Sequence, residues 1–350
     1  MLVMGLLAAT PQGWNPLVVA PGPEAEETLE EVRRELALGR HWHAAELLRA
    51  MDRQSPLEPE ARYLLAEALA GYRNWAGVLE VLEAADWVSE VAPVRGPYLM
   101  GRAHEALGNG VQAAGAYGRA YNAGDSPDFK TSARLARALY RSEGVEAALP
   151  VMESLSARQG ETGGLVSGLA WEMAGEAAEA GDTAGVRTLL SKVTVPALVG
   201  RSRGYPARAA LEAGDSVRAE GLYRELLTDA GSSGARARYS ERVGTLVLAR
   251  GDTAAAVDLF LEAFKAAPRS DAGMAAAAWV VDYVDLTPEL ALDAARSLGR
   301  AGDGRRALTA YDAYVDLVGD LGLQPDAGAR VERARLAATL PERVEEAVEE

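Results

Sequence analysis

The sequence predicts an all-α fold built from tandem helix pairs, and three observations lead to this prediction. Apolar residues recur at helical spacing along most of the chain, and the longest alternating β-branched candidate, residues 17–20, is too short for a strand of a packed sheet. Glycine-aspartate pairs break the helical pattern at regular places. A small residue follows each break at an interval that clusters near 34 residues, which is typical of a helix-turn-helix solenoid.

The clearest unit is Ser240–Pro268. Val243 lies on the apolar stripe of its first helix and Phe260 on that of its second helix. Gly251 favours the left-handed conformation that ends a helix, and Asp252 is a preferred residue for capping the next one. Neither helix can bury its apolar face alone, so the unit needs copies beside it.

The copies are recognised by a small or apolar residue near the start of each second helix. These positions are Ala44, Gly77, Ala113, Ala147, Val186, Ala219, Ala256 and Ala307. The intervals between them are 33, 36, 34, 39, 33, 37 and 51 residues. The last interval is long enough for an extra helix over about residues 271–284, before Pro288 opens the next pair.

These motifs resemble the tetratricopeptide-repeat (TPR) family over about residues 26–340. The residues that define the repeats by packing are Gly101, Gly108, Ala113, Tyr117, Gly181, Gly214, Ala219, Tyr223, Gly244, Gly251, Ala256, Phe260, Ala263, Pro268, Gly302, Ala307 and Tyr311. The first two units depart from the pattern, with Arg40 and Arg73 at their turns. The resemblance implies a TPR-like α-solenoid, a right-handed superhelix of about eight antiparallel helix pairs whose first helices line a concave binding face.

We expect the solenoid to span residues 24–340, after a lead over residues 1–23 and before an acidic tail or helix end over residues 341–350. The apolar run Leu2–Ala9 is either a short N-terminal segment or an export signal whose basic start lies upstream. A periplasmic or exported location is slightly favoured over a cytoplasmic one. No later run approaches the ~20 apolar residues that a membrane-spanning helix needs.

Charge and cysteine usage narrow the function classes. With 36 basic and 51 acidic residues the net charge is −15, which argues against nucleic-acid binding because that requires a basic surface. The chain has no cysteine, so disulfides, thiolate metal sites and thiol nucleophiles are excluded. We expect no catalytic residues, no metal and no cofactor. His41 and His43 are two residues apart and do not share a helix face, and His104 is expected to pack or to line the groove.

Arginines recur at the inner-face position of the first helices, and they are the candidate ligand-binding residues. The candidates are Arg33, Arg102, Arg208, Arg238, Arg242 and Arg296, with Arg95 and Arg201 near the same surface. Guanidinium groups pair with carboxylates or phosphates, so the groove is expected to bind anionic groups. The alternative is that these arginines pair with Glu and Asp of the same chain.

Trp42 and Trp75 lie 33 residues apart in equivalent places. They either pack between repeats or form an exposed stacking surface for a glycan or peptide.

Two narrower resemblances suggest contexts for the solenoid. Residues 42–87 are similar to the N-terminal helical region of bacterial soluble lytic transglycosylases, which act on peptidoglycan. The chain has no match to the catalytic part of that family: Glu153-Ser154 is similar to its Glu-Ser pair, but the Gly-Leu-Met-Gln segment that should follow is absent. Residues 307–336 resemble the end of the bacterial transcriptional activator domain, through Tyr311, Leu317, Asp320-Leu321-Gly322 and Pro325.

The sequence therefore predicts a non-catalytic scaffold that binds a protein, peptide or polymer on its concave face. One alternative is the helical scaffold of a peptidoglycan lytic transglycosylase without its catalytic domain. The other is a cytoplasmic regulatory or sensor module.

Overall fold

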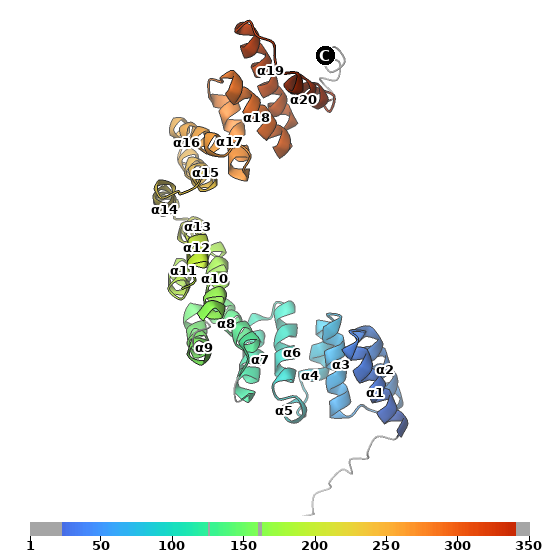
Figure 1. The fold of residues 1–350 in the computed structure, drawn as a ribbon. Coiled ribbons are helices and arrows are strands. Elements are labelled where there is room, and N and C mark those ends of the chain that lie inside the picture. The colour runs from blue at the N-terminus through green and yellow to red at the C-terminus, as the bar shows by residue number, and fades with distance from the viewer. Residues whose placement is uncertain (1–22, 125–126, 160–162, 341–350) are drawn as a thin grey trace, which may run out of the picture. The chain divides into compact units, whose positions relative to one another are not determined.

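A computed structural model describes residues 23–124, 127–159 and 163–340 of the protein. These residues form helices and short connections, with no strand among them. The prediction of an all-α, TPR-like solenoid of helix pairs is confirmed. The chain divides into two compact units, one up to Arg158 (unit 1) and one from Gln159 (unit 2) (Figure 1).

The described residues of unit 1 form four helix pairs and one short helix. Its helices are α1 (Pro23–Ala37), α2 (His41–Gln54), α3 (Pro59–Gly71), α4 (Trp75–Leu82), α5 (Val88–Val91), α6 (Arg95–Ala106), α7 (Gly110–Ala123), α8 (Phe129–Glu143) and α9 (Val145–Gln159). The pairs are α1 with α2, α3 with α4, α6 with α7, and α8 with α9. The first helices α1, α3 and α6 also contact one another in succession.

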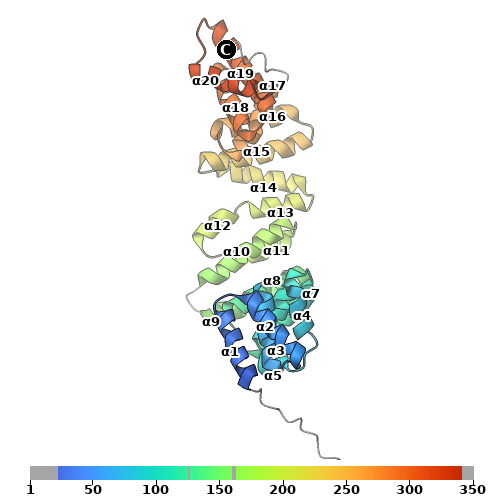
Figure 2. The ribbon, with the colours of Figure 1, turned by 90° about the vertical axis from the view of Figure 1, so that its right-hand side faces the viewer.

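Unit 2 continues the same construction. Its helices are α10 (Gly163–Glu179), α11 (Thr183–Leu190), α12 (Pro196–Ser202), α13 (Tyr205–Glu212), α14 (Ser216–Thr228), α15 (Ser233–Ala249), α16 (Thr253–Ala266), α17 (Asp271–Tyr283), α18 (Pro288–Ala301), α19 (Gly304–Asp320) and α20 (Ala327–Ala337). Figure 2 shows these helices following one another in chain order along unit 2. The extra helix expected over residues 271–284 is α17, which packs between α16 and α18.

A residue with left-handed backbone ends the first helix of each pair. These residues are Gly39, Arg73, Gly108, Gly144, Gly181, Gly214, Gly251 and Gly302. At the turn of the clearest unit, the Gly251 amide donates to the Leu248 carbonyl at 2.8 Å and the Asp252 amide donates to the Val247 carbonyl at 3.3 Å. The Asp252 side chain then accepts from the Ala255 amide and caps α16. This is the turn chemistry that the glycine-aspartate pairs predict.

The same two backbone hydrogen bonds recur at the other turns, except at Gly144. There α9 begins at Val145, directly after the left-handed glycine, so the connection is shorter.

The small residues near the start of the second helices are buried in the core, with two corrections. Ala44, Ala113, Val186, Ala219, Ala256 and Ala307 are each at most 1% exposed. In the second pair the buried residue is Val78 rather than Gly77, and in the fourth it is Ala148 rather than Ala147. The repeat alignment was wrong by one residue in these two pairs. In the second pair Arg73 replaces the turn glycine, and in the fourth the turn at Gly144 is short.

Two glycines allow close crossing of paired helices. A Cβ atom at Gly101 would lie 2.5 Å from the Tyr117 ring, and one at Gly244 would lie 2.9 Å from the Phe260 ring. Both rings are buried, so the glycines leave the space that the aromatic residues fill. The repeat pattern of small and aromatic residues therefore has a direct packing basis in the α6–α7 and α15–α16 pairs.

Some sequence expectations lie outside the described residues. These are the Leu2–Ala9 run, most of the lead over residues 1–23, and the acidic segment over residues 341–350. None of the described helices is long and apolar enough to cross a membrane.

Candidate functional site

Ion pairs join consecutive first helices in unit 1. Arg33 of α1 pairs with Glu60 of α3 at 2.7 Å, and also with Glu30 of its own helix. Arg95 of α6 pairs with Glu67 of α3 at 3.4 Å. Partly exposed pairs of this kind contribute roughly 0–1 kcal/mol each. Arg33, a candidate ligand-binding residue, therefore pairs with carboxylates of its own chain.

In unit 2 most of the candidate arginines also have carboxylate partners. Arg208 of α13 contacts Glu179 of α10 at 3.1 Å, and Arg242 contacts the neighbouring Glu241 at 3.6 Å. Arg296 of α18 donates to Glu332 of α20 at 2.9 Å. Arg238 is exposed, with no ion pair recorded among the described residues. Intrachain pairing thus accounts for Arg33, Arg208, Arg242 and Arg296.

Arg102 differs from these arginines. Its guanidinium carbon lies 5.3 Å from the centre of the Trp75 ring, in a cation–π contact. The Trp75 ring also packs against the buried core cluster that includes Val78, Leu82 and Met100. The Trp75 ring therefore packs between helices, and the residue also lines a pocket.

Arg102 and Trp75 line a pocket of about 280 Å³, which we call the Trp75 pocket. The pocket is lined by Arg73, Trp75, Arg102, Glu105, Ala106 and Arg134. Several elements meet there: the α3–α4 turn supplies Arg73, the start of α4 supplies Trp75, α6 supplies Arg102 and Glu105, and α8 supplies Arg134. Among the described residues, no carboxylate lies within ion-pair distance of Arg73 or Arg102.

A hydrogen-bonded cluster holds one wall of the Trp75 pocket. The Glu105 carboxylate accepts from Arg134 at 2.6 Å and from the Tyr117 hydroxyl at 2.8 Å. Arg134 also donates to the Tyr98 hydroxyl at 3.2 Å. Burial raises the pKa of Tyr117, and its hydrogen bond to Glu105 raises it further. The Tyr117 phenol therefore stays protonated and acts as a donor that fixes Glu105.

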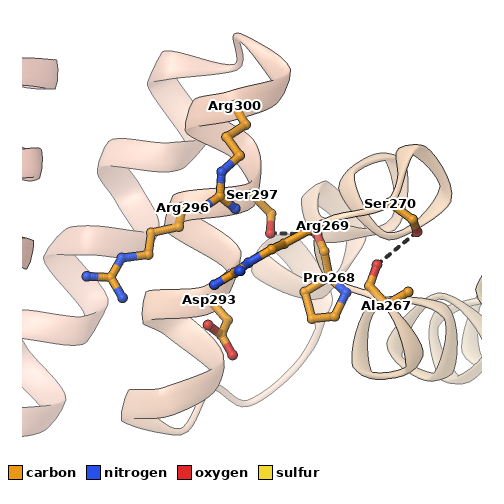
Figure 3. Close-up of a pocket in the computed structure, with 8 residues that line it drawn as sticks. All are labelled: Ala267, Pro268, Arg269, Ser270, Asp293, Arg296, Ser297 and Arg300. Atoms are coloured by element: carbon orange, nitrogen blue, oxygen red, sulfur yellow. Dashed lines mark hydrogen bonds between the residues drawn. The ribbon is translucent and has the colours of Figure 1, made fainter. Parts of the chain in front are cut away.

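Unit 2 has a pocket of similar size, about 290 Å³, which we call the Pro268 pocket (Figure 3). It is lined by Ala267, Pro268, Arg269, Ser270, Asp293, Arg296, Ser297 and Arg300. In Figure 3 the Arg269 side chain reaches toward α18, while the Arg296 side chain points away from Pro268. The Ser297 hydroxyl donates to the Pro268 carbonyl at 2.8 Å, so it ties α18 to this loop.

A second cluster, again of an arginine, a glutamate and a tyrosine, includes Arg296. Glu332 accepts from Arg296 at 2.9 Å and from the Tyr311 hydroxyl at 2.8 Å. Burial by itself raises the pKa of Glu332, but these two hydrogen bonds outweigh it and lower the pKa below its ordinary value. Burial and the bond to Glu332 raise the pKa of Tyr311. Glu332 therefore remains charged and neutralises Arg296.

The histidines have structural surroundings. His43 contacts the buried carboxylate of Glu35 at 2.9 Å, and His104 is buried with Glu83 at 3.5 Å. The His41 ring packs directly over Gly71. In the described ranges, no group of three or more His, Asp or Glu side chains is placed to hold a metal ion.

Sequence reasoning missed Arg73 and Arg134 as parts of one site with Arg102. Arg73 stands out in the sequence only as a departure from the turn glycine, and Arg134 lies outside the arginine positions aligned between repeats. Trp42, the counterpart of Trp75 in the first pair, is 63% exposed and lines neither of these two pockets.

No family model matches the sequence, and a search of curated proteins returned no match. Among solved structures, the chain is similar to the apo form of the quorum sensor NprR from B. thuringiensis, with 11% identity, a TM-score of 0.34 and coverage of 89% of this chain and 97% of that chain. It is similar to yeast Tom70, with 14% identity, a TM-score of 0.28 and coverage of 92% and 83%. It is also similar to the TPR domain of P58(IPK), with 16% identity, a TM-score of 0.27 and coverage of 93% and 81%.

Proposed function

We propose that this protein is a non-catalytic helical-repeat scaffold that binds an anionic segment of a protein or peptide partner at the Trp75 pocket. The observation that carries the proposal is the environment of Arg102. Its guanidinium group is held over the Trp75 ring and has no carboxylate partner among the described residues. Candidate arginines such as Arg33 and Arg208 are neutralised within the chain.

An unneutralised guanidinium group beside an aromatic ring favours an anionic ligand. The ring restricts the guanidinium group to a few orientations, so less side-chain entropy is lost on binding. Charge-assisted hydrogen bonds from arginine to carboxylate or phosphate are roughly twice as strong as neutral ones. The net charge of −15 repels anions at long range, so recognition depends on this local cluster of arginines.

The pocket dimensions favour one side chain of a larger partner over a free small molecule. Its volume of about 280 Å³ is at the lower limit of small-molecule sites, which span roughly 300–1,000 Å³. The lining is dominated by charged side chains rather than by the apolar residues typical of such sites. A peptide segment laid across the α3–α4 turn, α6 and α8 can place one acidic side chain in the pocket.

The test is a binding measurement with acidic and neutral peptide libraries, by calorimetry or by a change in tryptophan fluorescence. We expect acidic peptides to bind and Arg102→Ala to weaken them by about tenfold or more, the loss of one charge-assisted hydrogen bond. Arg119→Ala is the matched control, since Arg119 is an exposed arginine of α7 outside the pocket. Equal affinity of wild type and Arg102→Ala for every acidic peptide would contradict the proposal.

Two narrower alternatives stay predictions: a peptidoglycan-binding scaffold of lytic-transglycosylase type, and a regulatory sensor module. Co-sedimentation with purified sacculi tests the first. Retention on sacculi that Arg102→Ala leaves unchanged favours a peptidoglycan scaffold over the peptide-binding function proposed here.

A further inference from the structure

The charges of the Trp75 pocket are suited to a doubly charged anion. The residues that line it include three arginines, Arg73, Arg102 and Arg134, and one acidic residue, Glu105. Glu105 pairs with Arg134 at 2.6 Å and with Arg141 at 3.6 Å, so its charge is already offset by arginines other than Arg73 and Arg102. Arg73 and Arg102 remain, and the pocket keeps two positive charges.

Arg73 has an unusual backbone conformation. Its φ is +65°, and it is the one non-glycine residue with positive φ in the part of the chain that the structure describes. Glycine takes this place at the equivalent turns of the other pairs, for example at Gly108 and Gly251. An ordinary side chain in the left-handed region is less stable than glycine there, because its Cβ atom crowds the backbone.

The α3–α4 turn is otherwise built like its counterparts. The Arg73 amide donates to the Ala70 carbonyl at 3.1 Å and the Asn74 amide donates to the Leu69 carbonyl at 2.9 Å. The Asn74 side chain caps α4 by accepting from the Gly77 amide. Glycine adopts this local geometry at the equivalent turns, so the turn itself does not require an arginine. Arg73 lines the Trp75 pocket, and a role in that pocket explains why an arginine occupies the turn.

We propose that the Trp75 pocket binds a phosphate monoester carried on a peptide partner, and that Arg73 and Arg102 are the two residues that hold it. This inference rests on the function proposed above. A phosphate monoester carries about −1.5 to −2 charges at pH 7 and has three strong acceptor oxygens, so it can satisfy two guanidinium groups together. A single carboxylate carries one charge and is satisfied by one bidentate arginine, which leaves the second arginine unneutralised.

Three peptide libraries of otherwise identical degenerate sequence test this inference, with a fixed phosphoserine, a fixed Glu-Glu pair or a fixed serine at the centre. Inorganic phosphate is titrated alongside them. We expect the phosphoserine library to bind about tenfold more tightly than the Glu-Glu library, and the serine library not to bind. Inorganic phosphate should compete only weakly, because it lacks the peptide contacts.

Substitutions of Arg73 should change stability and ligand affinity in opposite directions, which a purely structural residue would not do. Arg73→Gly removes the strained side chain, so we expect the unfolding temperature to rise while affinity for the phosphoserine library falls about tenfold or more. Arg73→Lys keeps the charge and the backbone strain but loses the planar fork, so its affinity should be intermediate. Arg119→Ala again controls for the loss of one positive charge.

The outcomes separate this inference from the proposed function. If the phosphoserine and Glu-Glu libraries bind equally, and Arg102→Ala weakens both, the pocket binds acidic peptides and the phosphate assignment is wrong. If inorganic phosphate binds as tightly as the peptides, the peptide partner is wrong. If Arg102→Ala changes the affinity of none of the libraries, both the phosphate assignment and the proposed function are wrong. If Arg73→Gly lowers stability without changing affinity, Arg73 is a structural residue.

Discussion

The Trp75 pocket of unit 1 and the Pro268 pocket of unit 2 are built from similar parts. Each has three arginines in its lining, and in each one arginine is bonded to a glutamate that also accepts from a tyrosine hydroxyl. The difference lies in the remaining groups. The Trp75 pocket keeps two arginines beside an indole ring, whereas the Pro268 pocket keeps two arginines beside Asp293 and has no aromatic wall.

This difference shows that counting arginines does not identify a binding site. Asp293 reduces the charge of the Pro268 pocket to about half that of the Trp75 pocket. Arg269 and Arg300 are exposed, as is Arg73 of the Trp75 pocket, so these long side chains lose rotamer freedom when a ligand binds. The cation–π contact of Arg102 reduces that cost in unit 1. The comparison therefore predicts one strong anion site and one weak one.

Charge reversal in the two pockets should give the largest difference. Arg102→Glu places a carboxylate where the ligand anion binds, and we expect affinity for acidic or phosphorylated peptides to fall about a hundredfold. Arg300→Glu, the matched change in the Pro268 pocket, should alter affinity less than about threefold. Calorimetry on both variants measures this, and circular dichroism checks that helix content is unchanged. A large loss for Arg300→Glu would mean that the ligand uses unit 2 as well.

The glycines at the helix crossings should separate stability from binding. Gly101→Ala and Gly244→Ala place a Cβ atom against the rings of Tyr117 and Phe260, and each should cost about 1–3 kcal/mol of unfolding free energy. Tyr117 donates to Glu105 in the wall of the Trp75 pocket, whereas Phe260 has no polar group. Gly101→Ala should therefore also weaken peptide binding, and Gly244→Ala should not.

Denaturant unfolding gives the stability of both variants, and calorimetry at a temperature where both are folded gives their affinity. Equal binding by the two variants would mean that the Tyr117–Glu105–Arg134 cluster does not position the pocket.

Removing one carboxylate should make the Pro268 pocket resemble the Trp75 pocket. Asp293→Asn leaves Arg269 and Arg300 without an acidic neighbour in the lining, so affinity for a phosphoserine peptide should rise about tenfold at this pocket. The measurement is made in an Arg102→Glu background, where binding at unit 1 is suppressed. No gain in this background would show that the indole ring, rather than the charge balance, distinguishes the pockets.

The fold was predictable because its determinants are local. The turn at Gly251-Asp252 and the apolar stripes beside it are short-range patterns, and they recur with enough regularity to define the pairs. The Val78 and Ala148 positions were missed by one residue because turn length and turn residue vary between pairs.

The site was less predictable because it depends on contacts between pairs. Arg102 and Arg208 occupy equivalent places in the repeat, yet one lies over Trp75 and the other pairs with Glu179. Sequence spacing cannot distinguish these environments, since each partner comes from a preceding helix pair. Arg134 joins the pocket from the following pair, 29 residues after the Glu105 that it contacts. Such a contact is specified by how the pairs stack.

The smallest effect concerns the turn that carries Arg73. If Arg73 is kept at this turn because it binds ligand in the pocket, an arginine at an equivalent turn without a pocket should only lower the stability of the fold. Gly251 has φ of +93° and open space around it, so Gly251→Arg adds backbone strain without a steric clash. We expect a loss of about 1 kcal/mol of unfolding free energy, opposite in sign to the gain from Arg73→Gly.

Gly181→Ala should lower the unfolding free energy further, because its Cβ atom would lie 2.9 Å from the Ala213 backbone nitrogen. Denaturant unfolding of the three variants gives these differences, and no loss for Gly251→Arg would remove the strain argument for Arg73.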